Sequence, residues 1–362
     1  MRGNHRRKLV ALAVCVAVVV CVGLAADLAH AQPKSMKLKV AGVFAPPEVN
    51  SISATVKAWE EEVTARTNGR ITFENFWGAA LGAPAEHLDL VKTGTAQVAQ
   101  FTEQYQPKRL VVGDFEYVFP FGPTDYEIVA KATRQIRSEF KEFTTDYEKE
   151  NVLIIADPPV ATYNFISKVP LKNIADFQGK KISLIGRFFG KWLPPGATAV
   201  VRPAGERYDL LRSGVVDADL LPFEYSYVLK LHELAKYFVK VDLTTCAGAP
   251  IVMNLTTFKG LSPEDQKIVL EAGKNAEMKA VKEFLPQLWA KCEKAWKDAG
   301  VQFIVFPAEE KKKWADSLED TPAEWAAEVE AMGYPGFKIV QRWQEITAEM
   351  GYKWPRKWGV KK

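Results

Sequence analysis

The sequence predicts an α/β fold, and three features of its 362 residues indicate this. Apolar segments of strand length alternate with amphipathic helical segments between residue 38 and about residue 220. Helical composition then runs unbroken from Ser262 to about Ala299. The tail from Glu309 is again helical in composition and rich in tryptophan. Its tryptophans could stack on a carbohydrate or an aromatic ligand, but packing between amphipathic helices is favoured.

The first half contains four expected strands and three expected helices. The strands are residues 38–43, 71–76, 97–101 and 152–156. The first helix is capped by Asn50 or Ser51, since short polar side chains accept from the free N–H groups of a first turn. A second helix runs from Ala85 to Gly94, and the capping box Thr124-x-x-Glu127 opens a third that reaches about Tyr147.

The second half repeats the alternation and then changes character. Strands are expected at 182–185 and 215–220, with a helical segment at 205–213 between them. Ser262 and Pro263 then give a strong helix start, with a capping hydroxyl and a proline in the first turn. At ~1.5 Å per residue a helix to Ala299 is on the order of 50 Å long, which exceeds the width of one small lobe. Pro286 is expected to kink it.

Residues 1–31 have the features of a secretory signal peptide. Basic residues at positions 2 to 8 precede a nearly pure apolar run, Leu9 to Ala26, and Ala29-His30-Ala31 follows as a cleavage site. An uncleaved membrane anchor is the alternative, because the run approaches the ~18 residues of a spanning helix. The adjacent cleavage motif favours cleavage before Gln32, so we expect a periplasmic protein.

Composition excludes several classes of function. Removal of the signal segment lowers the formal net charge from +4 to +1, and no clustered basic face indicates nucleic-acid binding. Only His87 and His232 would remain, which argues against a histidine-rich metal site. Cys246 and Cys292 would also remain, either as a disulfide or as two buried free thiols.

A series of short motifs resembles one known family along residues 37 to 299. The motifs are Thr67-Asn68-Gly69-Arg70-Ile71, Gly78-Ala79-Ala80-Leu81-Gly82, Phe119-Pro120-Phe121, Phe177-Gln178-Gly179-Lys180-Lys181-Ile182, Glu206-Arg207-Tyr208 with Gly214-Val215-Val216-Asp217, Met253-Asn254 and Leu261-Ser262-Pro263. Each motif is weak alone. In this order and spacing they resemble the DctP-type substrate-binding proteins of tripartite ATP-independent periplasmic (TRAP) transporters.

The resemblance implies a two-lobed periplasmic binding protein fold with a long helix shared by both lobes. It implies lobe I at residues 32–156, the main part of lobe II at 157–245, and the return segments, shared helix and C-terminal helices at 246–362. It also implies that a small organic solute, usually an acid, binds between the lobes, which close around it and dock onto a membrane permease. The resemblance implies no catalysis, cofactor or metal.

One position departs from the family pattern. In relatives the Lys-Ile pair of the strand is followed by an arginine that holds the carboxylate of the solute by a bidentate contact. This sequence has Ser183 there, and the segment Pro158 to Tyr163 supplies no basic residue. We therefore expect a bulkier or less anionic solute, and weak binding of C4-dicarboxylates.

The candidate ligand-binding residues come from loops at the strand ends. In the first lobe they are Phe44, Glu48, Trp77, Phe101, Glu103 and Tyr105, and in the second lobe Tyr163, Ser183, Arg187, Asp219, Phe223 and Glu224. Arg187 and the backbone amides are the candidate contacts for an acid. The aromatic residues favour an aromatic, neutral or cationic solute instead.

Two other functions stay open at this point. A receptor that presents its ligand to a sensor kinase would have the same fold. A secreted hydrolase would need Ser183, His87 and an acid to form a catalytic set, but the sequence has neither G-x-S-x-G nor H-E-x-x-H.

Overall fold

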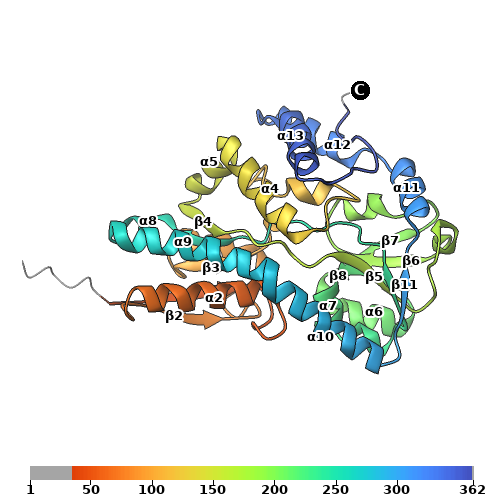
Figure 1. The fold of residues 1–362 in the computed structure, drawn as a ribbon, viewed down its shortest axis with the longest axis horizontal. Helices are drawn as coiled ribbons and strands as arrows, with labels where there is room; N and C mark the ends of the chain where they lie inside the picture. The colour runs from red at the N-terminus through yellow and green to blue at the C-terminus, as the bar shows by residue number, and fades with distance from the viewer. Residues whose placement is uncertain (1–34, 361–362) are drawn as a thin grey trace, which may run out of the picture.

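The computed structural model describes residues 35–360 and contains two β-sheets with helices packed on their faces (Figure 1). This confirms the α/β class and the two-lobed architecture. The expected signal peptide lies outside the described residues. None of the helices within 35–360 is both long and apolar enough to cross a membrane.

The first sheet forms the core of lobe I. Its strand order is β2 (Ile71–Phe76), β1 (Met36–Gly42), β3 (Val98–Gln100), β10 (Ile251–Asn254) and β4 (Val152–Ala156). β1 is parallel to β2 and β3, whereas β10 returns from the other lobe and is antiparallel to both of its neighbours. Apolar clusters lie on both faces, one beneath α2 (Ser51–Arg66) and the other beneath α3 (His87–Lys92).

The second sheet forms the core of lobe II. Its strand order is β11 (Gln302–Val305), β9 (Tyr237–Lys240), β5 (Tyr163–Ser167), β8 (Ala218–Pro222), β6 (Lys181–Leu184) and β7 (Thr198–Val201). Helices α6 (Arg207–Ser213) and α7 (Phe223–Val228) cover one face. The strand β5 is buried along its whole length and therefore shows no apolar–polar alternation in the sequence.

One long helical path connects the lobes. It consists of α9 (Pro263–Lys279), a π-helical turn (Ala280–Phe284) and α10 (Leu285–Asp298), and it runs diagonally across the molecule in Figure 1. α9 packs on α2 and β4 of lobe I, whereas α10 packs on α7 of lobe II. The expected cap is present, because Ser262 Oγ accepts from Asp265 N at 3.1 Å. Near Pro286, where a kink is expected, the path changes to the π-turn, which ends at Phe284, two residues before the proline.

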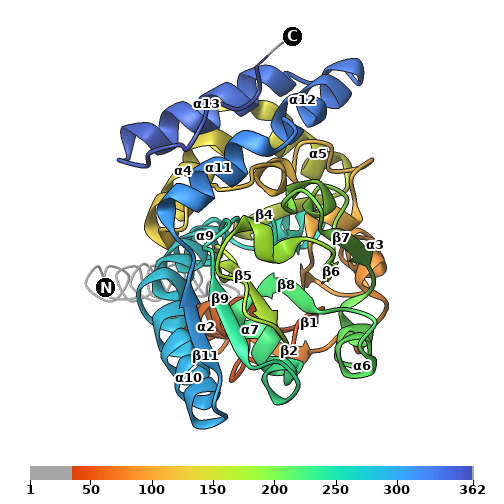
Figure 2. The same ribbon diagram turned by 90° about the vertical axis from the view of Figure 1, so that its right-hand side faces the viewer.

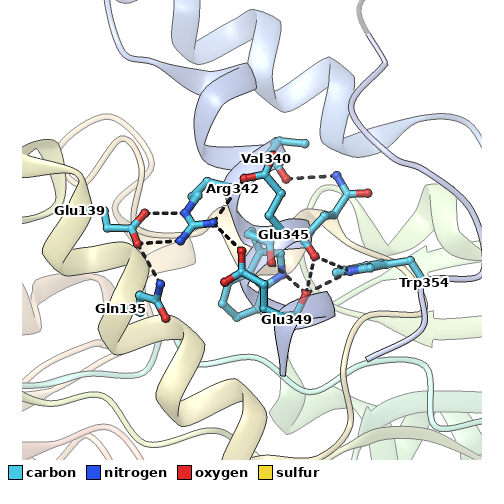
Figure 3. A network of polar contacts seen from close by, with 10 residues as sticks. Gln135, Glu139, Val340, Arg342, Glu345, Glu349 and Trp354 are labelled. Carbon is cyan, nitrogen blue, oxygen red and sulfur yellow. Dashed lines mark hydrogen bonds and ion pairs between the residues drawn. The ribbon is translucent and has the colours of Figure 1, made fainter. Parts of the chain in front are cut away.

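The C-terminal helices close the fold over α4 (Tyr126–Glu139) (Figure 2). They are α11 (Ala308–Ser317), α12 (Thr321–Ala331) and α13 (Gly336–Glu349). Their tryptophans pack as expected, because Trp314, Trp325 and Trp343 are fully buried in the main apolar cluster. Arg342 fixes α13 to α4 through two hydrogen bonds with Glu139, at 2.7 and 3.0 Å (Figure 3).

Two expectations about helices need correction. The helix from Thr124 begins instead at Tyr126, because Asp125 is the cap and accepts from Glu127 N and Ile128 N. It also ends earlier, since Phe140 adopts an extended conformation and separates α4 from α5 (Lys141–Lys149).

The remaining α-helix, α8 (Leu255–Lys259), follows β10 directly. Cys246 and Cys292 are buried free thiols.

Candidate functional site

A cavity of about 180 Å³ takes its walls from both lobes. Its lining contains five aromatic rings, seven aliphatic or proline side chains, one carboxylate and two uncharged polar side chains. The lining residues are Val43, Phe44, Ile52, Pro84, Thr102, Gln104, Tyr105, Tyr117, Val160, Tyr163, Ile185, Leu221, Pro222, Glu224 and Tyr225. Among the described residues that form this wall there is no lysine, arginine or histidine.

The strand ends place these side chains. Phe44 follows β1, Gln104 follows β3 and Ile185 follows β6, so three loops at the carboxyl ends of strands converge on one cavity. Ligands of open α/β sheets bind at such carboxyl ends. Tyr163 begins the antiparallel strand β5 and pairs with Pro222 at the end of β8, which brings it to the same edge.

Four of the candidate residues line this cavity: Phe44, Tyr105, Tyr163 and Glu224. Tyr163 is buried and packs edge-on against Phe189, with ring centroids 4.8 Å apart. Tyr105 is 42% exposed, the most open of the large apolar side chains on this wall. Phe44 contacts Tyr225 of the opposite lobe, also edge-on, at 6.0 Å.

Glu224 joins the two lobes across the cavity. It lies in the first turn of α7, and its carboxylate accepts from Ser51 N at 2.9 Å and Ser51 Oγ at 3.2 Å, at the start of α2. Burial raises the pKa of Glu224 to about 7, and the two Ser51 hydrogen bonds oppose the rise. A carboxylate placed at a helix N-terminus is also favoured by the helix dipole.

Ser183 and Asp219 form a buried pair just behind the cavity wall. They are register partners on the parallel strands β6 and β8, and the Ser183 hydroxyl donates to Asp219 Oδ2. Asp219 also accepts from Arg207 Nη1, at 2.9 Å for Oδ1 and 3.1 Å for Oδ2. Burial raises the pKa of Asp219, while the Arg207 charge and the Ser183 hydrogen bond oppose the rise.

Arg187 is placed away from the cavity. It lies beyond the end of β6 with a half-exposed side chain, pairs with Glu328 of α12 at 2.6 Å and stacks on Phe188 at 4.3 Å. The strand ends at Leu184 and Gly186 adopts a φ of +86°, so the chain turns before Arg187. Arg187, a candidate contact for an acid, therefore does not line this cavity.

The other candidates also lie outside the lining. Glu103 is buried and accepts from Arg137 and Tyr147, and Phe101 belongs to the lobe I core. Phe223 packs against Trp289 at 5.0 Å in lobe II. Trp77 lies against the strand end at Gly42, and Glu48 is exposed, with its backbone carbonyl accepting from Lys291.

Sequence reasoning did not select several residues that the fold brings to this site. Tyr117, Tyr225, Gln104 and Leu221 line the cavity, and Arg207 lies behind it. Leu221 directly follows the strand expected at 215–220, but as an apolar residue it was not selected as a ligand contact. For Arg207 the only signal was its charge at the variable position of the Glu-x-Tyr motif, at the start of the helix that follows β7.

Comparison with known proteins identifies the family. Residues 42–328 match the model of the bacterial extracellular solute-binding proteins, family 7. The chain belongs to this family. Its members are solute receptors rather than enzymes, so the hydrolase alternative is not favoured.

Individual relatives are distant but cover most of the chain. An uncharacterised protein of Salmonella typhimurium, YiiZ, is 26% identical over 72% of this chain and 78% of its own length. A TRAP solute-binding protein of an unidentified marine microbe, solved with 3-hydroxybenzoate, is 25% identical with a TM-score of 0.75, covering 88% of this chain and all of its own. One from Rhodoferax ferrireducens, solved with copurified benzoate, is 23% identical with a TM-score of 0.76, covering 87% of this chain and 98% of its own.

Proposed function

We propose that this family 7 receptor works in the periplasm with the membrane permease of a TRAP transporter and that its solute is a small aromatic carboxylic acid. The observation that carries the choice of solute is the aromatic wall of the cavity. Phe44, Tyr105 and Tyr117 come from lobe I, and Tyr163 and Tyr225 come from lobe II. A flat ring can contact both sets only when the lobes are closed.

The size and polarity of the cavity support the same class of solute. At about 180 Å³ it is smaller than the ~300–1,000 Å³ of pockets that hold drug-sized ligands. Most of its lining is apolar, so burying a hydrocarbon ring is favourable and burying a second charge is costly. A C4-dicarboxylate would place two charges in this wall, whereas benzoate has one charge and one ring.

The two solved relatives bound to benzoate and 3-hydroxybenzoate support an aromatic acid rather than an aromatic cation. Glu224, the one carboxylate among the described lining residues, does not oppose an anion strongly at pH 6.5, because burial raises its pKa to about 7. The partnership with a permease rests on the family membership. The division into lobes at residues 156 and 245 is part of the proposal.

A thermal-shift panel at pH 6.5 tests the solute. We expect 3-hydroxybenzoate and benzoate to raise the melting temperature by several degrees, because a ligand at 100 times its Kd stabilises by about 2.7 kcal/mol. Succinate, malate and fumarate should give no shift, and benzamide a smaller shift than benzoate. A shift with the dicarboxylates alone, or none with any aromatic acid, would overturn the proposal.

A further inference from the structure

Two of the three guanidinium nitrogens of the buried Arg207 make no hydrogen bond to the described residues. The side chain is fully buried in the first turn of α6. All hydrogen bonds of the Arg207 side chain come from Nη1, which donates to both oxygens of Asp219 and to Leu220 O at 3.3 Å. Nε and Nη2 have no hydrogen-bond partner among the described residues. Buried donors without a partner are rare in folded proteins, and a guanidinium carries five of them.

The unused edge has the geometry that a carboxylate requires. Nε and Nη2 form one edge of the planar guanidinium and donate nearly in parallel, so they match the two oxygens of one carboxylate. Asp219 occupies the other end of the group and holds it in place. Ser183, which stands where relatives have an arginine, donates to Asp219 and so supports the Asp219–Arg207 pair.

This group lies close to the cavity. Asp219 points to the same face of β8 as Leu221, which is two residues further along the strand and lines the cavity, and Ser183 is the register partner of Asp219 on β6. Ile185, which also lines the cavity, directly follows the end of β6. The rings of Tyr105 and Tyr163 are within reach of the same charge. Burial raises the pKa of both phenols, most strongly for Tyr163, and the Arg207 charge opposes the rise.

We propose that Arg207 binds the carboxylate of the solute and that helix α6 therefore supplies the contact that relatives obtain from the strand position of Ser183. Asp219 and Ser183 are positioning residues, which orient the guanidinium with its Nε–Nη2 edge toward the solute. The carboxylate enters between Ile185 and Leu221, with the aromatic ring left in the cavity. This inference rests on the proposed function and names the residue that selects for an acid.

Calorimetry on matched variants tests the assignment. The variants are Arg207→Lys, the charge-balanced pair Arg207→Met with Asp219→Asn, and the control Arg202→Met, which removes an exposed arginine of the same lobe. The double variant leaves no buried unpaired carboxylate. We expect it to bind 3-hydroxybenzoate roughly a hundredfold more weakly, because two hydrogen bonds to a charged group are lost. Arg207→Lys should recover part of this loss, and Arg202→Met should bind like the wild-type protein.

A neutral ligand separates the charge contact from cavity shape. The double variant should bind 3-hydroxybenzamide within about threefold of the wild-type protein, whereas a merely structural role of Arg207 would weaken acid and amide alike. Equal binding of the acid by the wild-type protein and the double variant would overturn the assignment and leave the proposed function standing. Failure of the wild-type protein to bind any aromatic acid would overturn both.

A measurement on the wild-type protein covers variants that do not fold. In ¹⁵N-labelled protein the Nε–H of Arg207 should be protected from exchange, because the side chain is fully buried, and the Arg207→Lys spectrum, which lacks it, assigns its resonance. Its resonance should shift when 3-hydroxybenzoate is added and should not shift with the amide. Binding of the acid without a shift of any arginine Nε–H would overturn the proposal.

Discussion

At the residue scale, Glu224 connects solute binding to closure of the lobes. Its carboxylate lines the cavity, and the same oxygens accept hydrogen bonds from the first residue of α2 in the opposite lobe. Opening the lobes would break these hydrogen bonds and return the carboxylate to water. A group that changes environment between two states makes their equilibrium depend on pH.

The affinity for the solute should therefore fall as the pH rises toward 7. In the closed state burial raises the pKa of Glu224 from 4.5 to about 7, so closing takes up a proton. The closed state is then fully favoured below 4.5, and this advantage is lost as the pH rises through 7. We expect the affinity for 3-hydroxybenzoate to weaken by up to about tenfold per pH unit between pH 5.5 and 7, and to level off above pH 7.5.

Glu224→Gln supplies the comparison, because its amide resembles the protonated acid. Titration calorimetry should find its affinity almost independent of pH, and at pH 5.5 up to about tenfold tighter than that of the wild-type protein, whose open-state carboxyl is already ionised there. Glu61→Gln, on the exposed side of α2, should keep the wild-type profile. The same pH profile in Glu224→Gln and the wild-type protein would show that another group titrates.

At the element scale, the shared helix packs closely on the sheet of lobe I at one glycine. A Cβ on Gly273 of α9 would lie 2.6 Å from Ile155 Cγ2, and closer still to the backbone of β4. Glycine in a helix interior costs about 0.5–1 kcal/mol relative to alanine, so its presence here reflects packing. The contact fixes the distance between α9 and β4, just before the chain crosses to lobe II.

Gly273→Ala should lower the free energy of unfolding by about 1–3 kcal/mol, because overpacking outweighs the gain in helix propensity. Urea denaturation measures the change. Gly260→Ala is the control, since Gly260 has a helical φ of −78° and its Cβ would meet only ordinary contacts at 3.4 Å or more. It should be neutral or slightly stabilising. A stabilised Gly273→Ala would mean that α9 can move away from β4.

The elements also show what local sequence can and cannot predict. The cap at Ser262, the helix irregularity beside Pro286 and the strand carrying Ser183 follow from short-range chemistry, and the structure contains them. Arg187 was misplaced because its orientation depends on a turn at Gly186 and on Glu328, 141 positions later in the chain. Arg207 was missed because its partners, Asp219 and Leu220 O, lie on β8 beyond the helix that Arg207 begins, and only the folded lobe brings helix and strand together.

At the scale of the whole molecule, buried acids gather where the chain crosses between the lobes. Arg137 pairs with Asp157 at 2.6 Å and with Glu103 at 3.0 Å. Asp157 accepts from Gly248 N at 3.1 Å, and Glu116 accepts from Ala247 N at 2.7 Å. The segment that leaves β4 at Asp157 and the segment that enters β10 after Gly248 are thus attached to the same cluster. In this cluster the carboxylates of Glu103, Glu116 and Asp157 lie near the Arg137 guanidinium.

This cluster should make the whole fold more stable at pH 6 than at pH 8. Burial raises the pKa of Glu103 to about 7 and of Glu116 to about 8, from 4.5 in both cases. The folded protein thus binds protons that the unfolded chain releases above 4.5, so stability from these groups is full below 4.5 and is lost as the pH rises through 7 and 8. We expect the free energy of unfolding to fall by up to about 5 kcal/mol between pH 5.5 and 8, about 2 from Glu103 and about 3 from Glu116, since each proton contributes at most 1.4 kcal/mol per pH unit. Urea denaturation at constant ionic strength measures this slope.

Glu116→Gln should flatten the pH dependence of stability, because the amide donates to Thr133 and accepts from Ala247 N without titrating. The exposed substitution Glu148→Gln should leave it unchanged. Stability that rises between pH 5.5 and 8 would mean that these acids remain ionised in the fold and that Arg137 alone balances them.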